Sequence, residues 1–202
     1  MDKPRPRFIA LEGCDASGKT TQAGLLADRM GALVTREPGD TPIGRRIRSL
    51  VLDHAPAGAA LDVRTEALLM AADRAQHVVE VIRPALSAGL HVITDRYIGS
   101  SLAYQGYGRG LSVAEVRRLS EWATGGLWPD VIVLLRVPLE LVMTRIADGI
   151  PDRLESEGAG FLSRVIAGFD ALADADPARW RVVDGTGTVE EVAARVVEAV
   201  GA

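Results

Sequence analysis

The chain has 202 residues, of which 48% are hydrophobic and 25% charged, a composition that is typical of globular proteins and excludes a disordered chain. The length predicts a single domain over residues 1–202, and the formal net charge of -4 argues against a general nucleic-acid binder. The one cysteine, Cys14, excludes an intramolecular disulfide and a cysteine-cluster metal site.

The apolar and amphipathic stretches predict an alternation of strands and helices. In chain order these are strand Phe8–Glu12, helix Lys19–Met30, strand Ala32–Thr35, helices Thr41–Asp53 and Asp62–Ala88, strand Leu90–Thr94, helix Ser112–Ala123, strand Val131–Val137, helices Leu139–Ala147 and Gly158–Ala173, strand Trp180–Val183 and helix Thr188–Val200. Continuous Val, Ile and Leu runs separated by helices are typical of a parallel sheet covered on both faces. The pattern therefore predicts an α/β fold and leaves the strand order open.

Several of these helices carry end signals. Thr41 is a predicted N-cap followed by Pro42, and Asp62 caps a long helix with a possible kink at Pro84. Capping boxes are predicted at Ser112 with Glu115 and at Thr188 with Glu191.

The start of the chain and its hydropathy predict a location. Met1–Arg7 is charged, and the apolar stretch and cleavage site of a signal peptide do not follow it. No apolar run approaches the ~20 residues that a membrane helix needs. We therefore expect a cytoplasmic protein.

A phosphate-binding motif follows the first predicted strand. It reads Gly13-Cys14-Asp15-Ala16-Ser17-Gly18-Lys19-Thr20, a complete match to G-x-x-x-x-G-K-[ST]. The glycines let the backbone curl so that its N–H groups point at phosphate oxygens, and the helix that follows adds its positive end. The motif assigns Lys19 to the β- and γ-phosphates and the Thr20 hydroxyl to Mg²⁺. The alternative, a glycine-rich turn without a ligand, is disfavoured by the strand before the motif and the helix after it.

Other features narrow the kind of phosphate-loop protein. No lysine follows Lys19, so the Asn-Lys-x-Asp motif with which GTPases read guanine is absent. Cys14 most simply fills space in the loop, and thiolate chemistry at the helix start is the less favoured alternative. Asp95 and Arg96 follow the third predicted strand, where a carboxylate can hold a metal ion and an arginine can hold an anionic substrate.

Arginines elsewhere indicate phosphoryl transfer between two phosphorylated molecules. Arg36, Arg74 and Arg153 lie in loops or helices that we expect near the nucleotide, where bidentate guanidinium groups fix phosphates and offset developing charge. Three further arginines lie close together on one predicted helix: Arg45, Arg46 and Arg48. We interpret them mainly as surface charge, and phosphate binding is the less favoured alternative.

Segments in matching order over nearly the whole chain resemble the thymidylate kinase family. They are Leu11–Gln22, Thr35–Gly39, Thr41–Gly44, Ala72–His77, Asp95–Gly106, Gly108–Gly110 and Asp152–Glu155. The resemblance implies a three-layer fold like that of nucleoside monophosphate kinases, with a central five-stranded parallel sheet, a phosphate loop at 13–20 and a lid at about 147–157. It also implies Mg²⁺-dependent transfer of the ATP γ-phosphoryl group to dTMP, giving dTDP for dTTP synthesis, by a homodimer joined through its long helices, with no nucleic-acid or membrane partner.

The same resemblance implies the site residues. Those for ATP are Gly13, Cys14, Asp15, Ala16, Ser17, Gly18, Lys19, Thr20 and Thr21. Those for dTMP are Asp15, Arg36, Met70, Arg74, Arg96, Ser101, Tyr104 and Gln105. The catalytic group comprises Lys19, Asp15, Arg96 and Arg153, and the metal ligands are Thr20 and Asp95.

Individual roles follow from the resemblance as well. Arg36 and Arg96 resemble the residues that bind the acceptor phosphate. Arg74 resembles a residue that contacts the thymine edge. Ser101 and Gln105 resemble base-side contacts. Tyr104 resembles the residue that crowds the ribose 2′ position and so favours deoxyribose.

The sequence departs from the family pattern in two places. The family commonly has an aromatic residue where this chain has Met70, which can pack on a base but offers no stacking quadrupole, or can simply belong to the core. Ala16 occupies a loop position that holds arginine in some relatives, and the stretch 147–151 has no arginine to compensate. Either Arg145 or Arg153 then carries the transition-state charge, and the sequence favours Arg153.

Two other functions stay open at this stage. One is a kinase for another deoxynucleotide or deoxynucleoside, which the segments Thr35–Gly39 and Tyr104-Gln105 fit poorly. The other is a non-catalytic nucleotide-binding regulator, against which the intact Lys19, Thr20 and Asp95 argue.

Overall fold

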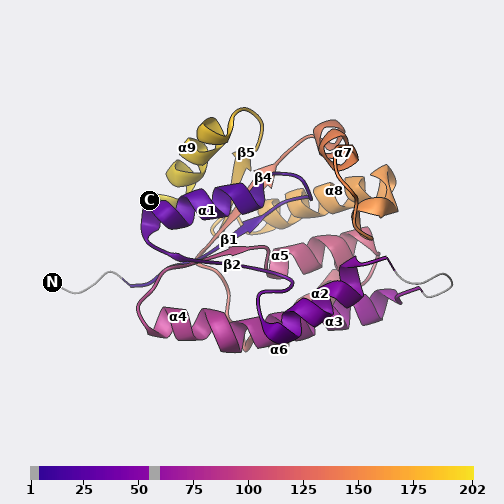
Figure 1. Cartoon of the computed structure of the whole chain (residues 1–202), viewed down its shortest axis with the longest axis horizontal. Coiled ribbons are helices and arrows are strands. Elements are labelled where there is room, and N and C mark those ends of the chain that lie inside the picture. Colours follow the sequence, from indigo (N-terminus) through magenta and orange to yellow (C-terminus); the bar gives the residue numbers. More distant parts are fainter. Residues whose placement is uncertain (1–4, 55–59) are drawn as a thin grey trace.

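A central parallel sheet organises the protein (Figure 1). The computed structural model describes residues 5–54 and 60–202; residues 1–4, with Lys3 and the start of the segment Met1–Arg7, lie outside the described residues. The strands are β1 (Phe8–Glu12), β2 (Leu33–Arg36), β3 (Val92–Asp95), β4 (Val131–Arg136) and β5 (Trp180–Asp184). Their order in space is β2-β3-β1-β4-β5, with every pairing parallel. The α/β class and the five-stranded parallel sheet are confirmed.

Helices cover both faces of this sheet (Figure 1). They are α1 (Lys19–Met30), α2 (Pro42–Leu52), α3 (Val63–His77), η1 (Val78–Ile82), α4 (Arg83–Ser87), α5 (Ile98–Ser101), η2 (Leu102–Gly108), α6 (Val113–Thr124), α7 (Leu139–Ala147), η3 (Glu155–Glu157), α8 (Ala159–Ala175) and α9 (Val189–Val200). In the part of the chain that the structure describes, every helix falls short of the length and apolar character of a bilayer-crossing segment.

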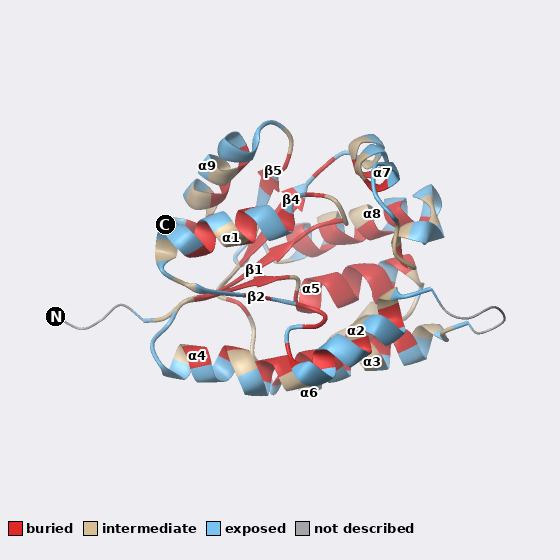
Figure 2. Ribbon diagram, in the orientation of Figure 1, coloured by how far each residue is buried: buried red, intermediate tan, exposed pale blue. Residues whose placement is uncertain are grey.

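The two faces of the sheet form separate apolar clusters. On one face, Ile9 and Leu11 of β1 pack with Leu26 of α1 and Val196 of α9. The other face is larger and includes Phe8, with side chains from η2 and α8 such as Tyr104 and Phe169. Figure 2 shows the inner strands β1, β3 and β4 almost wholly buried between these layers, whereas the edge strands β2 and β5 are partly exposed. Strands buried on both faces explain why their sequences are continuously apolar rather than alternating.

The long predicted helix over Asp62–Ala88 is present, but it is not uniform. Asp62 caps α3 by accepting from the backbone N–H groups of Arg64 and Thr65. A π-helical turn, η1, interrupts the helix just before Pro84, and α4 continues it. Proline has no N–H and its ring crowds the carbonyl four residues earlier, so the wider turn accommodates it without breaking the helix.

Sequence periodicity did not predict the helical stretch α5–η2. Glycines lower its intrinsic helix propensity. They are needed here because a Cβ at Gly99 would lie 2.7 Å from Glu12 Oε1 and one at Gly108 would lie 2.7 Å from a ring carbon of Phe161. Close packing against β1 and α8, rather than local preference, therefore forms this segment.

Candidate active site

The phosphate loop lies between β1 and α1, at the carboxyl end of the sheet. Gly13 has φ 146°, and a Cβ there would lie 2.7 Å from the carbonyl oxygen of Leu135 in β4. Gly18 has φ 91° and precedes the first residue of α1, whose first turn contains no acidic side chain. The loop therefore presents backbone N–H groups and a positive helix end to an anion, as the motif predicts.

Lys19 lies folded over this loop. Its Nζ donates to the carbonyl oxygen of Cys14 at 2.6 Å and to Ser17 Oγ at 3.2 Å. Burial lowers the pKa of Lys19 from its ordinary value, although Asp95 and Asp15 act in the opposite direction. An anionic phosphate in the loop would supply the negative charge that favours the protonated form.

The predicted metal ligands lie next to each other. Thr20 Oγ1 donates to Asp95 Oδ2 at 2.5 Å, which joins the start of α1 to the end of β3. The other carboxylate oxygen, Asp95 Oδ1, is buried without a hydrogen-bond partner in the structure. A hydroxyl beside an unpaired buried carboxylate oxygen is a donor set that suits Mg²⁺, which commonly takes one or two protein oxygens together with water and phosphate oxygens.

Arg96, Asp15 and Tyr104 form one cluster beside the loop. The Arg96 guanidinium is ion-paired with Asp15 and donates to the carbonyl oxygen of Gly13 at 3.0 Å and to Ser100 Oγ at 2.9 Å. Tyr104 donates its hydroxyl proton to Asp15 Oδ2 at 2.6 Å, and its ring lies 5.1 Å from Arg96 Cζ. Burial alone would raise the pKa of Asp15, but Arg96 and Lys19 outweigh it and hold that pKa below its ordinary value. Asp15 is therefore ionised, and its charge is paired with Arg96.

The backbone of Arg96 is also unusual. Its φ of 72° lies in the left-handed region that residues other than glycine rarely adopt. Such a conformation costs about 1–3 kcal/mol and persists only where the surroundings hold it, most often at functional sites. Here the contacts with Gly13, Asp15 and Ser100 hold the side chain in place.

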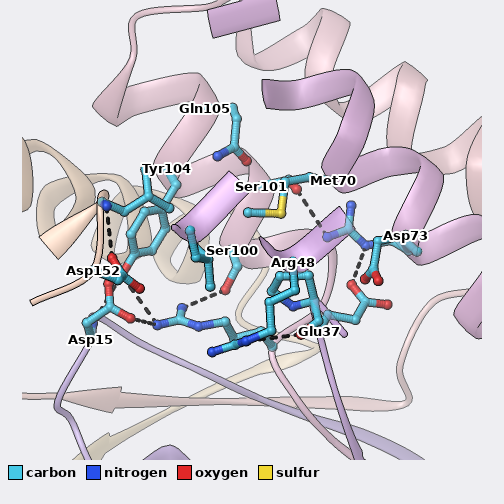
Figure 3. Close-up of a pocket in the computed structure, with 15 residues that line it drawn as sticks. Asp15, Glu37, Arg48, Met70, Asp73, Ser100, Ser101, Tyr104, Gln105 and Asp152 are labelled. Atoms are coloured by element: carbon cyan, nitrogen blue, oxygen red, sulfur yellow. Dashed lines mark hydrogen bonds and ion pairs between the residues drawn. The ribbon is translucent and has the colours of Figure 1, made fainter. Parts of the chain in front are cut away.

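A pocket opens beside this cluster, with about 570 Å³ of empty space counting its open mouth, within the ~300–1,000 Å³ range of small-molecule sites. Its lining comprises Asp15, Glu37, Pro38, Arg48, Leu52, Met70, Asp73, Arg74, Arg96, Ser100, Ser101, Tyr104, Gln105, Asp152 and Leu154. Figure 3 shows Gln105, Ser101 and Met70 toward one end and Asp15 and Arg48 toward the other. Gln105, Ser101 and Met70 are uncharged, so the first end is suited to a neutral ring. At the other end Arg48, and Arg96 beside Asp15, supply the positive charge that suits an anionic group.

A buried polar network fixes Arg74 in the wall of this pocket. Arg74 Nε donates to Glu37 Oε2 at 2.7 Å, and Nη2 donates to the carbonyl oxygen of Tyr97 and to Ser101 Oγ, both at 3.1 Å. Glu37 in turn pairs with His77, 2.9 Å from Oε1 to Nδ1. His77 is itself fully buried within this polar network.

Asp73 lies beside that network, and only one of its two carboxylate oxygens has a hydrogen-bond partner in the structure. Its Oδ1 accepts from the backbone N–H of Gly39 at 3.0 Å, and its Oδ2 is buried without a partner in the structure. Burial first, and then the nearby charge of Glu37, raise the pKa of Asp73 to about 6.

A second buried carboxylate, Glu66 of α3, lies behind the pocket. It accepts from Gln105 Nε2 at 2.9 Å, from Arg109 Nη2 at 3.0 Å and from Arg153 Nη2 at 2.6 Å. Arg109 also pairs with Glu157 at 2.6 Å. Burial alone would raise the pKa of Glu66, but the hydrogen bonds from Arg109, Arg153 and Gln105 outweigh it and lower that pKa. Glu66 is therefore ionised and shared between the pocket wall and the lid.

The structure places Arg36 outside the lining of the pocket. This residue ends β2 beside Asp95, but its side chain is exposed and does not line the pocket. Successive side chains of a strand point to opposite faces, so while Thr35 turns inward to His77, Arg36 turns away. Arg48, which the sequence assigned mainly to surface charge, lines the pocket and donates to the carbonyl oxygen of Pro38 at 3.0 Å.

The two arginines on either side of the stretch 147–151 have different contacts. Arg145 Nη1 donates to the carbonyl oxygen of Ala16 in the phosphate loop at 2.9 Å. Arg153 is bound to Glu66 and to the carbonyl oxygen of Val51, and it does not line the pocket. Of these two, the structure therefore brings Arg145, and not the favoured Arg153, to the phosphate loop.

Among the remaining predicted residues, Met70, Arg74, Ser101, Tyr104 and Gln105 are brought together in the pocket wall. Four lining or supporting acids were missed: Glu37, Glu66, Asp73 and Asp152. Glu37 and Asp73 lie within the segments Thr35–Gly39 and Ala72–His77 that carried the resemblance, so their motifs gave a signal. Glu66 gave none, because an acidic residue in the first turn of a helix is ordinary.

A phosphate loop on a parallel α/β sheet, joined to a second pocket with an anionic and a ring-sized end, defines a P-loop kinase of small phosphorylated acceptors. A family model described as thymidylate kinase matches residues 11–196. The chain belongs to the thymidylate kinase family.

Individual relatives agree with this. The chain is 51% identical to a thymidylate kinase of Thermomicrobium roseum, over 92% of this chain and 90% of that protein. It is 50% identical to one of Bifidobacterium longum, over 94% of each chain. The crystal structure of thymidylate kinase from Ehrlichia chaffeensis superposes with a TM-score of 0.80 at 30% identity, covering 98% of this chain and 100% of that one. The protein is accordingly an enzyme that transfers the γ-phosphoryl group of ATP to dTMP, giving dTDP.

Proposed function

We propose that the phosphate loop 13–20, together with Thr21, binds the ATP phosphates and that Lys19 and Arg96 carry the transfer of the phosphoryl group. The observation that carries this proposal is the Arg96–Asp15 ion pair, which lies where the phosphate loop meets the acceptor pocket. A dTMP phosphate oxygen attacks the γ-phosphorus as the bond to the ADP oxygen breaks. That oxygen is already ionised, so no side chain need remove a proton.

In the acceptor pocket, we assign the phosphate of dTMP to Arg96 and Arg48, and the thymine to Arg74, Ser101 and Gln105. The assignment of Arg36 to the same phosphate stays a prediction from the sequence. Met70 lies where it can pack on the base, and Tyr104, held by Asp15, stands beside the sugar.

Thr20 and Asp95 would hold Mg²⁺, which would supply charge neutralisation for the β- and γ-phosphates. The unpartnered Asp95 Oδ1 supports this assignment. Arg145, through its contact with Ala16, is placed to stabilise charge on the transferring group. The assignment of that task to Arg153 stays a prediction from the sequence.

The surface supports a homodimer through the long helices. Leu68 of α3, Val79 of η1 and Trp122 of α6 are 57%, 66% and 82% exposed, and α3 and α6 pack against each other. Large apolar side chains on neighbouring helices are typical of an interface between subunits. Sedimentation velocity should give a dimer, and Trp122→Glu should shift it toward a monomer. We also place the enzyme in the cytoplasm, where ATP and dTMP are available, without a nucleic-acid or membrane partner.

A coupled ADP-release assay with Mg-ATP tests the assignment of the acceptor. The acceptors would be dTMP, dUMP, the other monophosphates and thymidine. We expect strong preference for dTMP. Equal turnover of thymidine would contradict the placement of an acceptor phosphate at Arg96 and Arg48.

A further inference from the structure

Glu66 does not line the acceptor pocket, but its carboxylate contacts Gln105, which does. Glu66 is 0% exposed and Gln105 1%, and the two side chains meet at 2.9 Å through Gln105 Nε2. An ionised carboxylate can only accept hydrogen bonds. The carboxamide must therefore turn its NH₂ group toward Glu66, which leaves its oxygen as the end that remains for a ligand.

Ser101 has the opposite polarity. Its Oγ accepts from Arg74 Nη2 at 3.1 Å, so its own proton is free to be donated. Figure 3 shows Ser101 and the carboxamide oxygen of Gln105 on neighbouring sides of this end of the pocket, beside Met70. The wall thus offers donors from Arg74 and Ser101 next to an acceptor from Gln105.

This pattern matches one kind of pyrimidine edge. Thymine and uracil present a carbonyl acceptor at C4 beside an N3–H donor. Cytosine presents an amino donor at C4 beside an N3 acceptor, so both of its groups would face groups of the same kind. A buried polar group left unpaired in this way can reduce turnover by several orders of magnitude.

We propose that Glu66 is a positioning residue that sets the base specificity of the enzyme, by holding the Gln105 carboxamide so that its oxygen selects pyrimidines with an N3–H. The inference rests on the proposed contact between Gln105 and the base. It goes beyond that contact because Glu66 does not touch the base itself and acts only by orienting Gln105. Glu66 is itself held by Arg109, through Nε at 3.3 Å and Nη2 at 3.0 Å, and by Arg153. These arginines keep its charge and position fixed.

The test is the ratio of kcat/KM values for dTMP, dUMP and dCMP in Glu66→Gln. A glutamine at this position can donate as well as accept, so the Gln105 carboxamide can turn over. We expect the preference for dTMP over dCMP to fall about tenfold. The preference for dTMP over dUMP, which depends on the methyl group, should change less than twofold. A general loss of structure would change the dTMP to dCMP ratio and the dTMP to dUMP ratio to a similar extent.

Arg109→Lys is the matched control, because it disturbs a partner of Glu66 without touching Gln105 and should leave the dTMP to dCMP ratio as it is. If Glu66→Gln does not fold, the double variant E66Q/R109Q replaces it, since it removes one charge of each sign. Gln105→Met distinguishes the contact between Gln105 and the base from the orienting role of Glu66. A changed ratio in Gln105→Met with none in the Glu66 variant overturns the role of Glu66, whereas no change in either overturns the base contact itself.

Discussion

The phosphate side and the base side of this active site are built in different ways. The phosphate side uses consecutive residues of one loop, and its main groups are backbone N–H groups, Lys19 and the start of α1. The base side uses side chains from α3, α5 and η2, supported by buried carboxylates such as Glu37 and Glu66. A phosphate is recognised by charge and backbone, whereas a base needs donors and acceptors fixed in direction. We therefore expect substitutions on the phosphate side to act on turnover, and those on the base side to act on choice of acceptor and on stability.

Lys19→Ala should give the largest effect. It removes the ammonium group that would meet the β- and γ-phosphates, and kcat should fall by about 10³-fold. The fold should remain intact, as far-UV circular dichroism and thermal unfolding would show. Near-normal turnover would mean that the phosphate loop does not have the role given to it here.

The pair Arg145→Ala and Arg153→Ala tests which arginine serves the phosphate side. Arg145 contacts the loop at Ala16, so its removal should lower kcat by about 10²-fold with little change in the KM for dTMP. Arg153→Ala should lower kcat less and should lower thermal stability more, because Glu66 loses a buried partner. A lower kcat in Arg153→Ala than in Arg145→Ala would mean that Arg153 stabilises the charge on the transferring phosphoryl group.

Asp73→Asn tests the buried charge on the base side through pH. The pKa of Asp73 is raised from 3.8 to about 6 in the folded protein. Between those values the unfolded chain has already lost the proton that the folded protein keeps, so stability falls as the pH rises through this window. The variant should be more stable than the original by about 3 kcal/mol above pH 6 and not below pH 4. Denaturant unfolding at pH 4 and pH 7.5 measures this, and an equal difference at both pH values would contradict it.

Met70→Phe should give the smallest effect. Met70 lines the pocket, and an aromatic ring there would stack on the thymine by about 0.5–1 kcal/mol more than a thioether. The KM for dTMP should fall about threefold with kcat unchanged. A KM that stays the same would place Met70 in the core rather than over the base.

The order of helices and strands, the α/β class and the phosphate loop were predictable, because each depends on hydrophobic period or on a short contiguous motif. The structure moved the edges of several elements by a few residues, for example the second strand from Ala32–Thr35 to Leu33–Arg36 and the third from Leu90–Thr94 to Val92–Asp95. Backbone pairing with neighbouring strands sets such edges, and a single sequence does not contain that information.

The sequence by itself determined the family, the phosphate loop and seven of the fifteen residues that line the acceptor pocket, because motifs keep their spacing. Only the tertiary structure decided that Arg48 rather than Arg36 faces the pocket, that Arg145 rather than Arg153 meets the phosphate loop, and that Glu66 holds Gln105. The direction of a side chain depends on strand pleat and helix packing. The ionic partner that an arginine takes depends on which carboxylate the fold buries beside it. Local sequence predicts neither the direction of a side chain nor its ionic partner.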